Sequence, residues 1–335
     1  MSIFSYTGTG RKFYSSPYFI YAVGLALLAL SSYLCLFYGG PVNNFVDKET
    51  ASLVIREIRF PKLIASILAG GALSLAGFVF QGVLRNPLSD PYILGVSSGA
   101  ALGTALYVVL AGGMFGILGA KIFSFVGALF AVSLLIFIYR LMSKNTSAMI
   151  LAGVGISLFF SSIITFIMSN IEGSRLLYLS SWLIGSVSNP ELNELYFLFF
   201  ILAIGFIILF IYSDVLDVIK FGDDFSVSSG VNIKLYMTLF IVTASMLTAA
   251  TVSICGTLGF IGLVVPHMTK LVLNHRTRYL LPAIFIFGAS FLTLCTFVAG
   301  FFSTGFDIPS GAVSSFIGAP VLLYLLYRRY NAKNL

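Results

Sequence analysis

The sequence gathers unusual polar chemistry in one short stretch, LRNPLSDPYILGVSSGA at residues 84–100. Arg85, Asp90, two prolines and a run of Gly and Ser could form a phosphate-binding loop, a catalytic loop or a turn between helices. A phosphate loop needs a preceding strand and a lysine at its end, and neither is present here. The stretch therefore predicts a tight turn, in which Pro87 ends one helix, Asp90 caps the next and Pro91 begins it.

The remaining reactive residue types do not form a recognisable site. His267 follows Pro266 and His275 lies in NHRTR, but no partner ligand stands at metal spacing. The three cysteines fall singly in apolar stretches, which indicates neither a disulfide framework nor a zinc site. An enzyme acting on lipid is disfavoured, because no nucleophile is paired with a base. We expect no catalytic residue, no metal and no cofactor in this chain.

The composition indicates a membrane protein. Of 335 residues, 59% are hydrophobic and only 9% are charged, whereas soluble domains carry about 25% charged residues. A span needs about 20 apolar residues, and the chain offers that length many times. The net charge of +7 comes from cations at the ends of apolar stretches, so we expect lipid and not nucleic acid as its surroundings.

The apolar stretches predict an all-α, polytopic protein with about ten transmembrane helices in one domain, residues 1–335. Residues 176–189, which contain Trp182, favour an interfacial or re-entrant helix between the fifth and sixth spans. The predicted spans are 17–38, 61–83, 91–111, 114–140, 147–169, 194–213, 235–254, 257–273, 279–302 and 309–327.

Charge asymmetry predicts the orientation. Ten spans put both termini on one side, and 13 of the 19 Lys and Arg residues fall on that side. Both termini, including segment 1–16, should therefore be cytoplasmic. The polar connections are too short for a nucleotide-binding domain, and no G-x-x-x-x-G-K-[ST] loop occurs. Any ATP-driven step would need another chain.

The spans lack acidic residues near their middles. Ion-coupled secondary transporters usually need a titratable or oxygen-rich site at the midplane, and channels for metal ions are expected to show acidic rings. Both classes are therefore disfavoured, with the ion-gradient-driven transporter kept as the alternative function.

Small and hydroxylated residues recur along one face of the fifth predicted span. Gly153, Ser157, Ser161 and Thr165 stand four residues apart, so on a helix they share a face. Small residues let helices pack closely in lipid, which alone explains such a stripe. The alternative is a weakly polar lining along which a large solute passes without being gripped. Both interpretations stay open, and this span is the candidate pathway lining.

Two polar regions could receive partners. On the exported side, REIRFPKL places Arg56, Arg59 and Lys62 three residues apart. They are either interfacial cations or a docking surface for an acidic partner. On the cytoplasmic side, residues 214–231 favour a short amphipathic helix with turns at Gly222 and Gly230. This loop is either a solvated linker or a helix presented to a partner.

Several motifs, in order, resemble the permease subunits of ABC importers for iron–siderophore complexes, haem and cobalamin. The motifs are RFPK (59–62), QGVLRNPLSDPYILGVSSGA (81–100), LAGVG (151–155), WLIGS (182–186), GDDFSVSSGV (222–231), GFIGLVVPH (259–267) and IGAPVLLYLL (317–326). The resemblance runs from about residue 53 to the C-terminus. It implies a type II importer permease in a prokaryotic plasma (inner) membrane. Its partners would be a second permease, identical or closely related, two cytoplasmic ATPase subunits and an extracytoplasmic substrate-binding protein.

The resemblance also implies roles for individual residues outside the membrane. Arg59 and Lys62 match a basic pair that meets acidic residues of the binding protein, and Arg56 is an additional neighbouring cation. A further docking arginine of the family aligns with Gly300, so that contact is absent from this sequence. Cytoplasmic residues 214–234 match the coupling loop that the ATPase receives. Its matching positions are Gly222, Asp223, Ser226 and Gly230, while Ser229 departs from the family pattern.

At the start of the fifth span, Thr146 and Ser147 match a narrow cytoplasmic constriction of the family. The sequence thus predicts a permease that passes an iron complex or related large chelate inward, driven by ATP hydrolysis on partner subunits. The chain itself would be no enzyme.

Overall fold

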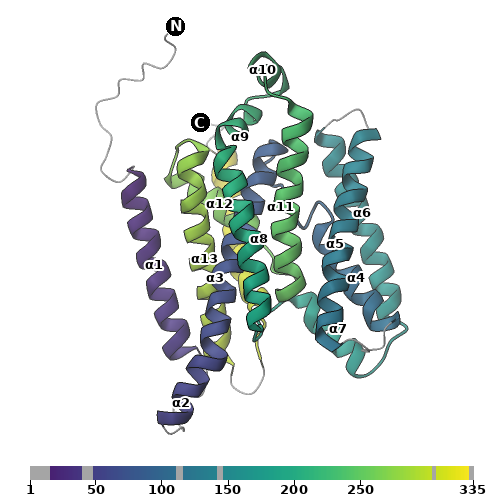
Figure 1. Ribbon diagram of the computed structural model, residues 1–335, viewed down its shortest axis with the longest axis vertical. Helices are drawn as coiled ribbons and strands as arrows, with labels where there is room; N and C mark the ends of the chain where they lie inside the picture. Colours follow the sequence, from purple (N-terminus) through teal and green to yellow (C-terminus); the bar gives the residue numbers. More distant parts are fainter. Residues whose placement is uncertain (1–15, 40–47, 111–115, 142–145, 304–306, 332–335) are drawn as a thin grey trace.

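The computed structural model describes residues 16–39, 48–110, 116–141, 146–303 and 307–331, and all regular elements within these ranges are helices. The predicted N-terminal segment 1–16 lies outside the described residues apart from Ser16. The all-α prediction is confirmed, and no cis peptide occurs in the described ranges. The apolar stretches of the sequence therefore form a bundle of helices (Figure 1).

Seven of the helices are long and apolar enough to cross a membrane. One of them is continuous from Glu49 to Val83, although its first part belongs to α2 (Lys48–Val54) and the π-helix η3 (Ile55–Arg59). The seven are α1 (Pro17–Tyr38), α3 (Phe60–Val83) with its N-terminal extension, α5 (Gly116–Leu141), α6 (Thr146–Met168), α8 (Leu192–Ile211), α11 (Ile233–Cys255) and α13 (Thr277–Phe302).

The other three predicted spans coincide with two shorter apolar helices, α4 (Val96–Leu110) and α12 (Ile261–Val272), and with α14 (Ser310–Asn331), whose apolar part is the shorter stretch Ser310–Leu325. The predicted interfacial helix at 176–189 is α7 (Ser174–Ile184). The predicted amphipathic loop helix is a pair of short helices, α9 (Ser213–Lys220) and α10 (Asp223–Ser228). All the expected elements are thus present; the first span has the predicted bounds, 17–38, and the bounds of the others differ.

Helix α3 forms the centre of the bundle and is buried along most of its length. Its small residues let neighbouring backbones approach closely. A Cβ added at Gly70 would lie 2.3 Å from the carbonyl oxygen of Gly288 in α13. A Cβ added at Gly77 would lie 1.8 Å from the carbonyl oxygen of Gly262 in α12. The small residues of α3 therefore form a packing surface, as expected for helices in lipid.

Two predicted helix starts are wrong. Helix α4 begins at Val96 and not at Pro91, because residues 91–95 form turns that end at Gly95, whose φ is +87°. Helix α12 begins at Ile261 and not at 257, since Gly256 and Phe260 have φ of +68° and +67°. Irregular backbone at such depth is tolerated in membrane proteins where protein surrounds it. No residue in either segment is exposed.

The two candidate docking regions lie at opposite ends of the bundle (Figure 1). Helix α2 projects from one end, and α9 and α10 stand at the other. Helix α1 begins at the end that carries α9 and α10. The fold therefore separates the two regions by the full length of the spanning helices.

Candidate functional sites

The outer cluster of Arg56, Arg59 and Lys62 is shaped by the π-helix η3. Pro61 has no N–H and its ring would clash with the carbonyl one turn earlier in an α-helix, and a π-bulge directly before it absorbs the mismatch. A π-helix pairs residue i with i+5, so residues three apart diverge around the axis. Accordingly, the side chain of Arg56 is 84% exposed, whereas Arg59 is 7% exposed.

The guanidinium of Arg59 forms a hydrogen bond inside the protein. Its Nη1 donates to the carbonyl oxygen of Leu36 at 2.7 Å, near the C-terminus of α1. This contact holds α1 against the start of α3. Arg56 lies within 3.5 Å of Glu57 in an exposed ion pair, and Lys62 is partly exposed. The predicted three-cation stripe is therefore divided into two surface cations and one structural arginine.

The structure explains why position 300 is a glycine and not the arginine that the resemblance implies. In α13 it faces Gly39 at the end of α1, and a Cβ at this position would lie 2.5 Å from the carbonyl oxygen of Gly39. An arginine would force α1 away from α13. The chain therefore has a close helix contact at the position where the resemblance implies an arginine.

At the opposite end, α9 and α10 form a bent pair of helices. Leu216 and Ile219 of α9 are fully buried, as the amphipathic pattern predicts. Gly222 separates the helices with φ +123°, and Gly230 follows α10 with φ +74°. No side chain crowds either glycine, so the requirement here is the left-handed backbone.

Ser226 fixes the bend between α9 and α10. It is fully buried, and its Oγ donates to the carbonyl oxygens of Gly222 at 2.7 Å and Val218 at 3.3 Å. Outside this bend, Phe221, Phe225 and Val227 are 74%, 51% and 66% exposed. The side chain of Asp223 lies outside the described residues. A rigid bend with apolar side chains on its outer surface is a suitable shape for a cleft in another protein.

Contacts that the sequence alone does not reveal join α9 to the start of α13 and to the turn after α3. Asp217 Oδ2 accepts from the backbone N–H of Thr277 at 2.9 Å, and so caps α13. Lys220 Nζ lies 3.0 Å from Asp217 Oδ1, and burial lowers the pKa of this lysine. Arg85 donates from Nε to the carbonyl oxygen of Ile219 at 2.9 Å. The i,i+3 spacing of Asp217 and Lys220 is the sequence feature from which their ion pair could have been predicted.

The candidate pathway face on α6 has two halves. Gly153 is buried, and a Cβ there would lie 2.8 Å from the Cα of Leu94. Ser157 is partly buried and lies 3.4 Å from the carbonyl oxygen of Tyr92. Ser161 and Thr165 are exposed. The structure therefore supports close packing for the first half of the stripe and leaves the second half available as a lining.

The residues of the predicted constriction lie at the start of α6. Thr146 begins the helix, although its side chain lies outside the described residues, and Ser147 is exposed. Their position on the same helix as the exposed half of the stripe is compatible with a continuous face.

The WLIGS motif joins three chain segments after α7. The backbone N–H of Ser186 donates to the carbonyl oxygen of Cys255 at 2.8 Å, and that of Gly311 to Gly185 at 3.0 Å. The N–H of Val187 donates to Ser310 Oγ at 3.0 Å. These bonds connect the ends of α7 and α11 to the start of α14, so the motif has a structural function.

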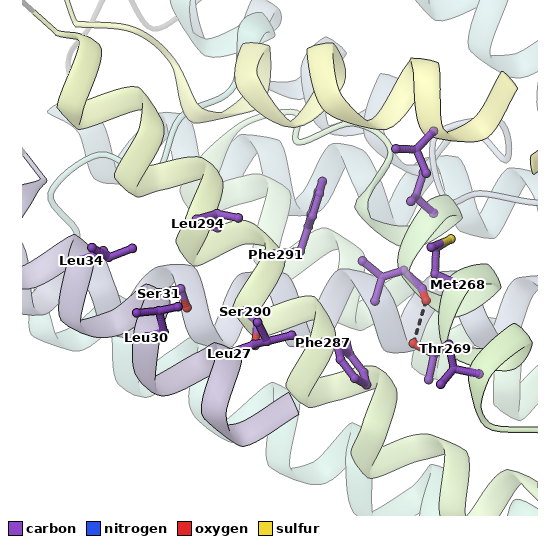
Figure 2. A pocket seen from close by; sticks show the side chains of 14 residues that line it. Leu27, Leu30, Ser31, Leu34, Met268, Thr269, Phe287, Ser290, Phe291 and Leu294 are labelled. Carbon is purple, nitrogen blue, oxygen red and sulfur yellow. Dashed lines mark hydrogen bonds between the residues drawn. The ribbon is translucent and has the colours of Figure 1, made fainter. Parts of the chain in front are cut away.

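An apolar pocket of about 420 Å³ lies between α1, α12, α13 and α14 (Figure 2). Its three hydroxyl groups are engaged within their own helices. Ser31 donates to Leu28 at 3.0 Å, Thr269 to Val265 at 2.8 Å and Ser290 to Ile286 at 2.8 Å. The pocket therefore offers little to a polar solute. Within the described ranges, no three His, Cys, Asp or Glu residues gather as metal ligands would.

Comparisons with known proteins agree on one family. The model of the FecCD transport family matches residues 19–328. The chain is 34% identical to the ABC transporter permease protein YvrB of Bacillus subtilis, over 88% of this chain and 83% of that protein. It is 33% identical to a probable iron chelatin transport system permease protein of Helicobacter pylori, over 92% and 98%.

A cobalamin import system permease protein of Halobacterium salinarum is 32% identical, over 88% of this chain and 79% of that protein. Among solved structures, a metal-chelate type ABC transporter in an inward-facing conformation matches with a TM-score of 0.83 and 26% identity. That match covers 93% of this chain and 99% of the other.

Proposed function

Because this chain belongs to the FecCD transport family, we propose that it is the membrane permease subunit of an ABC importer that takes up a metal chelate. The observation that carries the proposal is the family match over residues 19–328, nearly the whole chain. Relatives are named for iron chelatin, cobalamin and iron(3+)-hydroxamate import. The cargo is accordingly an iron(III)–siderophore complex or a related large chelate such as haem or cobalamin.

The permease carries out no covalent chemistry, and ATP is hydrolysed on two separate cytoplasmic subunits. The bent pair α9–α10 enters a cleft of the ATPase, with Gly222, Asp223, Ser226 and Gly230 setting its shape. Displacement of this pair would act on α13 through Asp217 and Thr277 and on the α3–α4 turn through Arg85. ATP-driven movement would thereby reach the spanning helices.

The substrate-binding protein docks at the outer end, onto surface cations. Arg56 and Lys62 meet acidic side chains there, since charge complementarity steers encounter and fixes register. Arg59 positions this surface by holding α1 to η3, and it cannot reach a partner without leaving that bond. Both termini lie in the cytoplasm, on the side of α9 and α10, in the plasma (inner) membrane of a prokaryote.

Two permease chains, identical or closely related, enclose the pathway. The exposed half of the α6 stripe, Ser161 and Thr165, faces it, and Thr146 and Ser147 narrow it at the cytoplasmic end. The Thr165 hydroxyl is satisfied by the carbonyl oxygen of Ser161 in its own helix, and the lining residues are small and uncharged. They therefore offer a solute only weak binding, which lets it leave.

The test is chelate uptake into proteoliposomes that contain the permease with its ATPase and binding protein. We expect uptake to require ATP on the side of the membrane where the ATPase subunits lie. Ionophores should leave it unaffected. Uptake that persists without the ATPase, and collapses when an ionophore dissipates the ion gradient, would identify an ion-driven transporter and refute the proposal.

A further inference from the structure

A charged cleft of about 1350 Å³ opens at the end of the bundle that carries α9 and α10. Its walls come from the end of α3, from α9 and α10, and from α12 and the turn into α13. In the proposed transport cycle Arg85 and Asp217 hold α9 to its neighbours, but Lys270, His275 and Arg276 of the lining have no role. The charged or titratable residues in its lining are Arg85, Asp214, Asp217, Lys220, Lys270, His275 and Arg276.

The acidic residues of the cleft do not neutralise it. Asp217 is fully engaged, because Lys220 and the Thr277 hydroxyl donate to its Oδ1 and the Thr277 N–H donates to its Oδ2. Asp214 is exposed at the start of α9. Four lysine and arginine residues face two carboxylates across the lining, so a net positive charge remains.

Lys270 is held by uncharged partners. Its Nζ donates to Gln81 Oε1 at 3.1 Å and lies 4.7 Å from the centre of the Phe78 ring. Lys220 Nζ lies 4.6 Å from the same ring, so two ammonium groups share one aromatic side chain. In the part of the chain that the structure describes, no carboxylate forms an ion pair with Lys270.

A partly buried ammonium without a counter-ion is costly, and an anion beside it would recover that cost. The ring offers only part of the compensation, since cation–π contacts are individually weak. The cleft is wide enough for more than one small ion. Arg276, which is exposed at the start of α13, adds a forked donor at its edge.

We propose that this cleft binds a phosphate group, with Lys270 as its central donor and Arg276 at its edge. Phosphate suits a compact ammonium beside a guanidinium, because its several oxygens accept from both. Two sources carry this chemistry at a cytoplasmic membrane surface, namely the headgroup of an anionic lipid and free inorganic phosphate. The occupant would lie between α9 and α12, beside the proposed ATPase contact. The proposal does not depend on the identity of the cargo.

The test measures the thermal midpoint of the purified full-length chain in a neutral detergent. One arm adds inorganic phosphate against chloride at equal ionic strength, and the other adds phosphatidylglycerol against phosphatidylcholine. We expect one of the two phosphate carriers to raise the midpoint in a saturable manner. A response to inorganic phosphate identifies a free anion as a sufficient ligand, and a response to phosphatidylglycerol alone identifies the lipid headgroup.

Substitutions at Lys270 assign the response to the cleft. Lys270→Met keeps an unbranched side chain that is one atom shorter and removes its charge, so the half-saturating concentration should rise by at least about tenfold. Lys270→Arg should retain binding. Lys234→Met removes an exposed lysine at the start of α11, outside the cleft lining, and should bind as the wild type does.

The unliganded midpoint of Lys270→Met checks that the variant folds. It should equal or exceed that of the wild type, because an uncompensated charge has been removed. Should Lys270→Met not fold, Lys270→Gln replaces it in the same comparison. The proposal is overturned if neither phosphate carrier exceeds its control, or if the charge-free Lys270 variant responds as strongly as Lys234→Met.

Discussion

At the scale of single residues, Asp90 is the clearest departure from expectation. The sequence placed it on a cytoplasmic turn as a helix cap, whereas the structure buries it to 6% exposure. Its Oδ1 has no hydrogen-bond partner and lies 3.2 Å from the position of a Cβ added at Gly262. Burial raises the pKa of this carboxyl to about 7, although the backbone N–H of Tyr92 partly offsets the effect.

Asp90 should make stability depend on pH. A carboxyl whose pKa is higher in the folded state than in the unfolded state favours folding most at low pH. That contribution is lost as pH rises from about 4, the unfolded value, to about 7. We expect Asp90→Asn to match the wild type near pH 4 and to be more stable above pH 7, by on the order of a few kcal/mol.

Thermal midpoints of the wild type and Asp90→Asn, measured across this pH range, provide the check. Asp224→Asn is the control, because Asp224 is an exposed acid and its removal should leave the pH profile unchanged. Parallel profiles for the wild type and Asp90→Asn would show that the buried carboxyl does not titrate in this range.

The outer cations illustrate what residue spacing can predict. RFPK and its neighbours predict a basic region, and in the structure these residues lie in η3 and at the start of α3. The three-residue spacing did not reveal that Arg59 turns inward to Leu36, since that depends on the π-helix before Pro61. A local change of helix type redirects side chains by a large angle, and sequence periodicity assumes a constant helix.

At the scale of helices, the apolar pattern predicted which segments would be helical but not where two of them begin. Helices α4 and α12 start several residues late, at Val96 and Ile261. Composition did not separate these turns from helix, because their residues are apolar and buried as in a span. The deciding features are the positive φ at Gly95 and Phe260, and a positive φ is rare for a bulky residue such as Phe260.

The contact between α3 and α12 should depend on a single glycine. A Cβ at Gly77 would lie 1.8 Å from the carbonyl oxygen of Gly262, so Gly77→Ala must separate the two helices. We expect a loss of roughly 1–3 kcal/mol or more in the free energy of unfolding. The measurement is the thermal midpoint of the purified chain, with α12 displacement as the physical cause.

Gly155→Ala is the matched control for this prediction. Gly155 also lies inside a spanning helix, α6, but no atom lies within 4 Å of an added Cβ. Alanine there should be neutral or stabilising by roughly 0.5–1 kcal/mol, because it favours the helix. If both alanine variants lost equal stability, close approach at Gly77 would not be the reason.

At the scale of the whole molecule, the two ends of the bundle are connected through the same central helix, α3. Arg59, just before α3, donates to α1, and Arg85, just after α3, donates to α9. Asp217 of α9 in turn accepts from the start of α13. Charge and amphipathicity in the sequence predict both candidate docking regions. The sequence could not predict these joints, since they connect residues far apart in the chain through backbone groups.

The outer half of the α6 face provides the last prediction, which distinguishes a pathway lining from a lipid contact. Ser161 is exposed, and Leu25 of α1 is 53% exposed on a helix at the edge of the bundle. The native cysteines Cys35, Cys255 and Cys295 are all buried, so an introduced cysteine can be labelled selectively.

In the assembled transporter, a membrane-impermeant maleimide should label Ser161→Cys, because a thiol in a water-filled pathway ionises and reacts. The same reagent should leave Leu25→Cys unmodified, since a thiol in hydrocarbon stays protonated and inaccessible. Labelling of Ser161→Cys should also change when ATP is supplied, as the pathway opens and closes. Equal resistance of both cysteines in every nucleotide state would place Ser161 against lipid, and the stripe on α6 would then be a packing surface along its whole length.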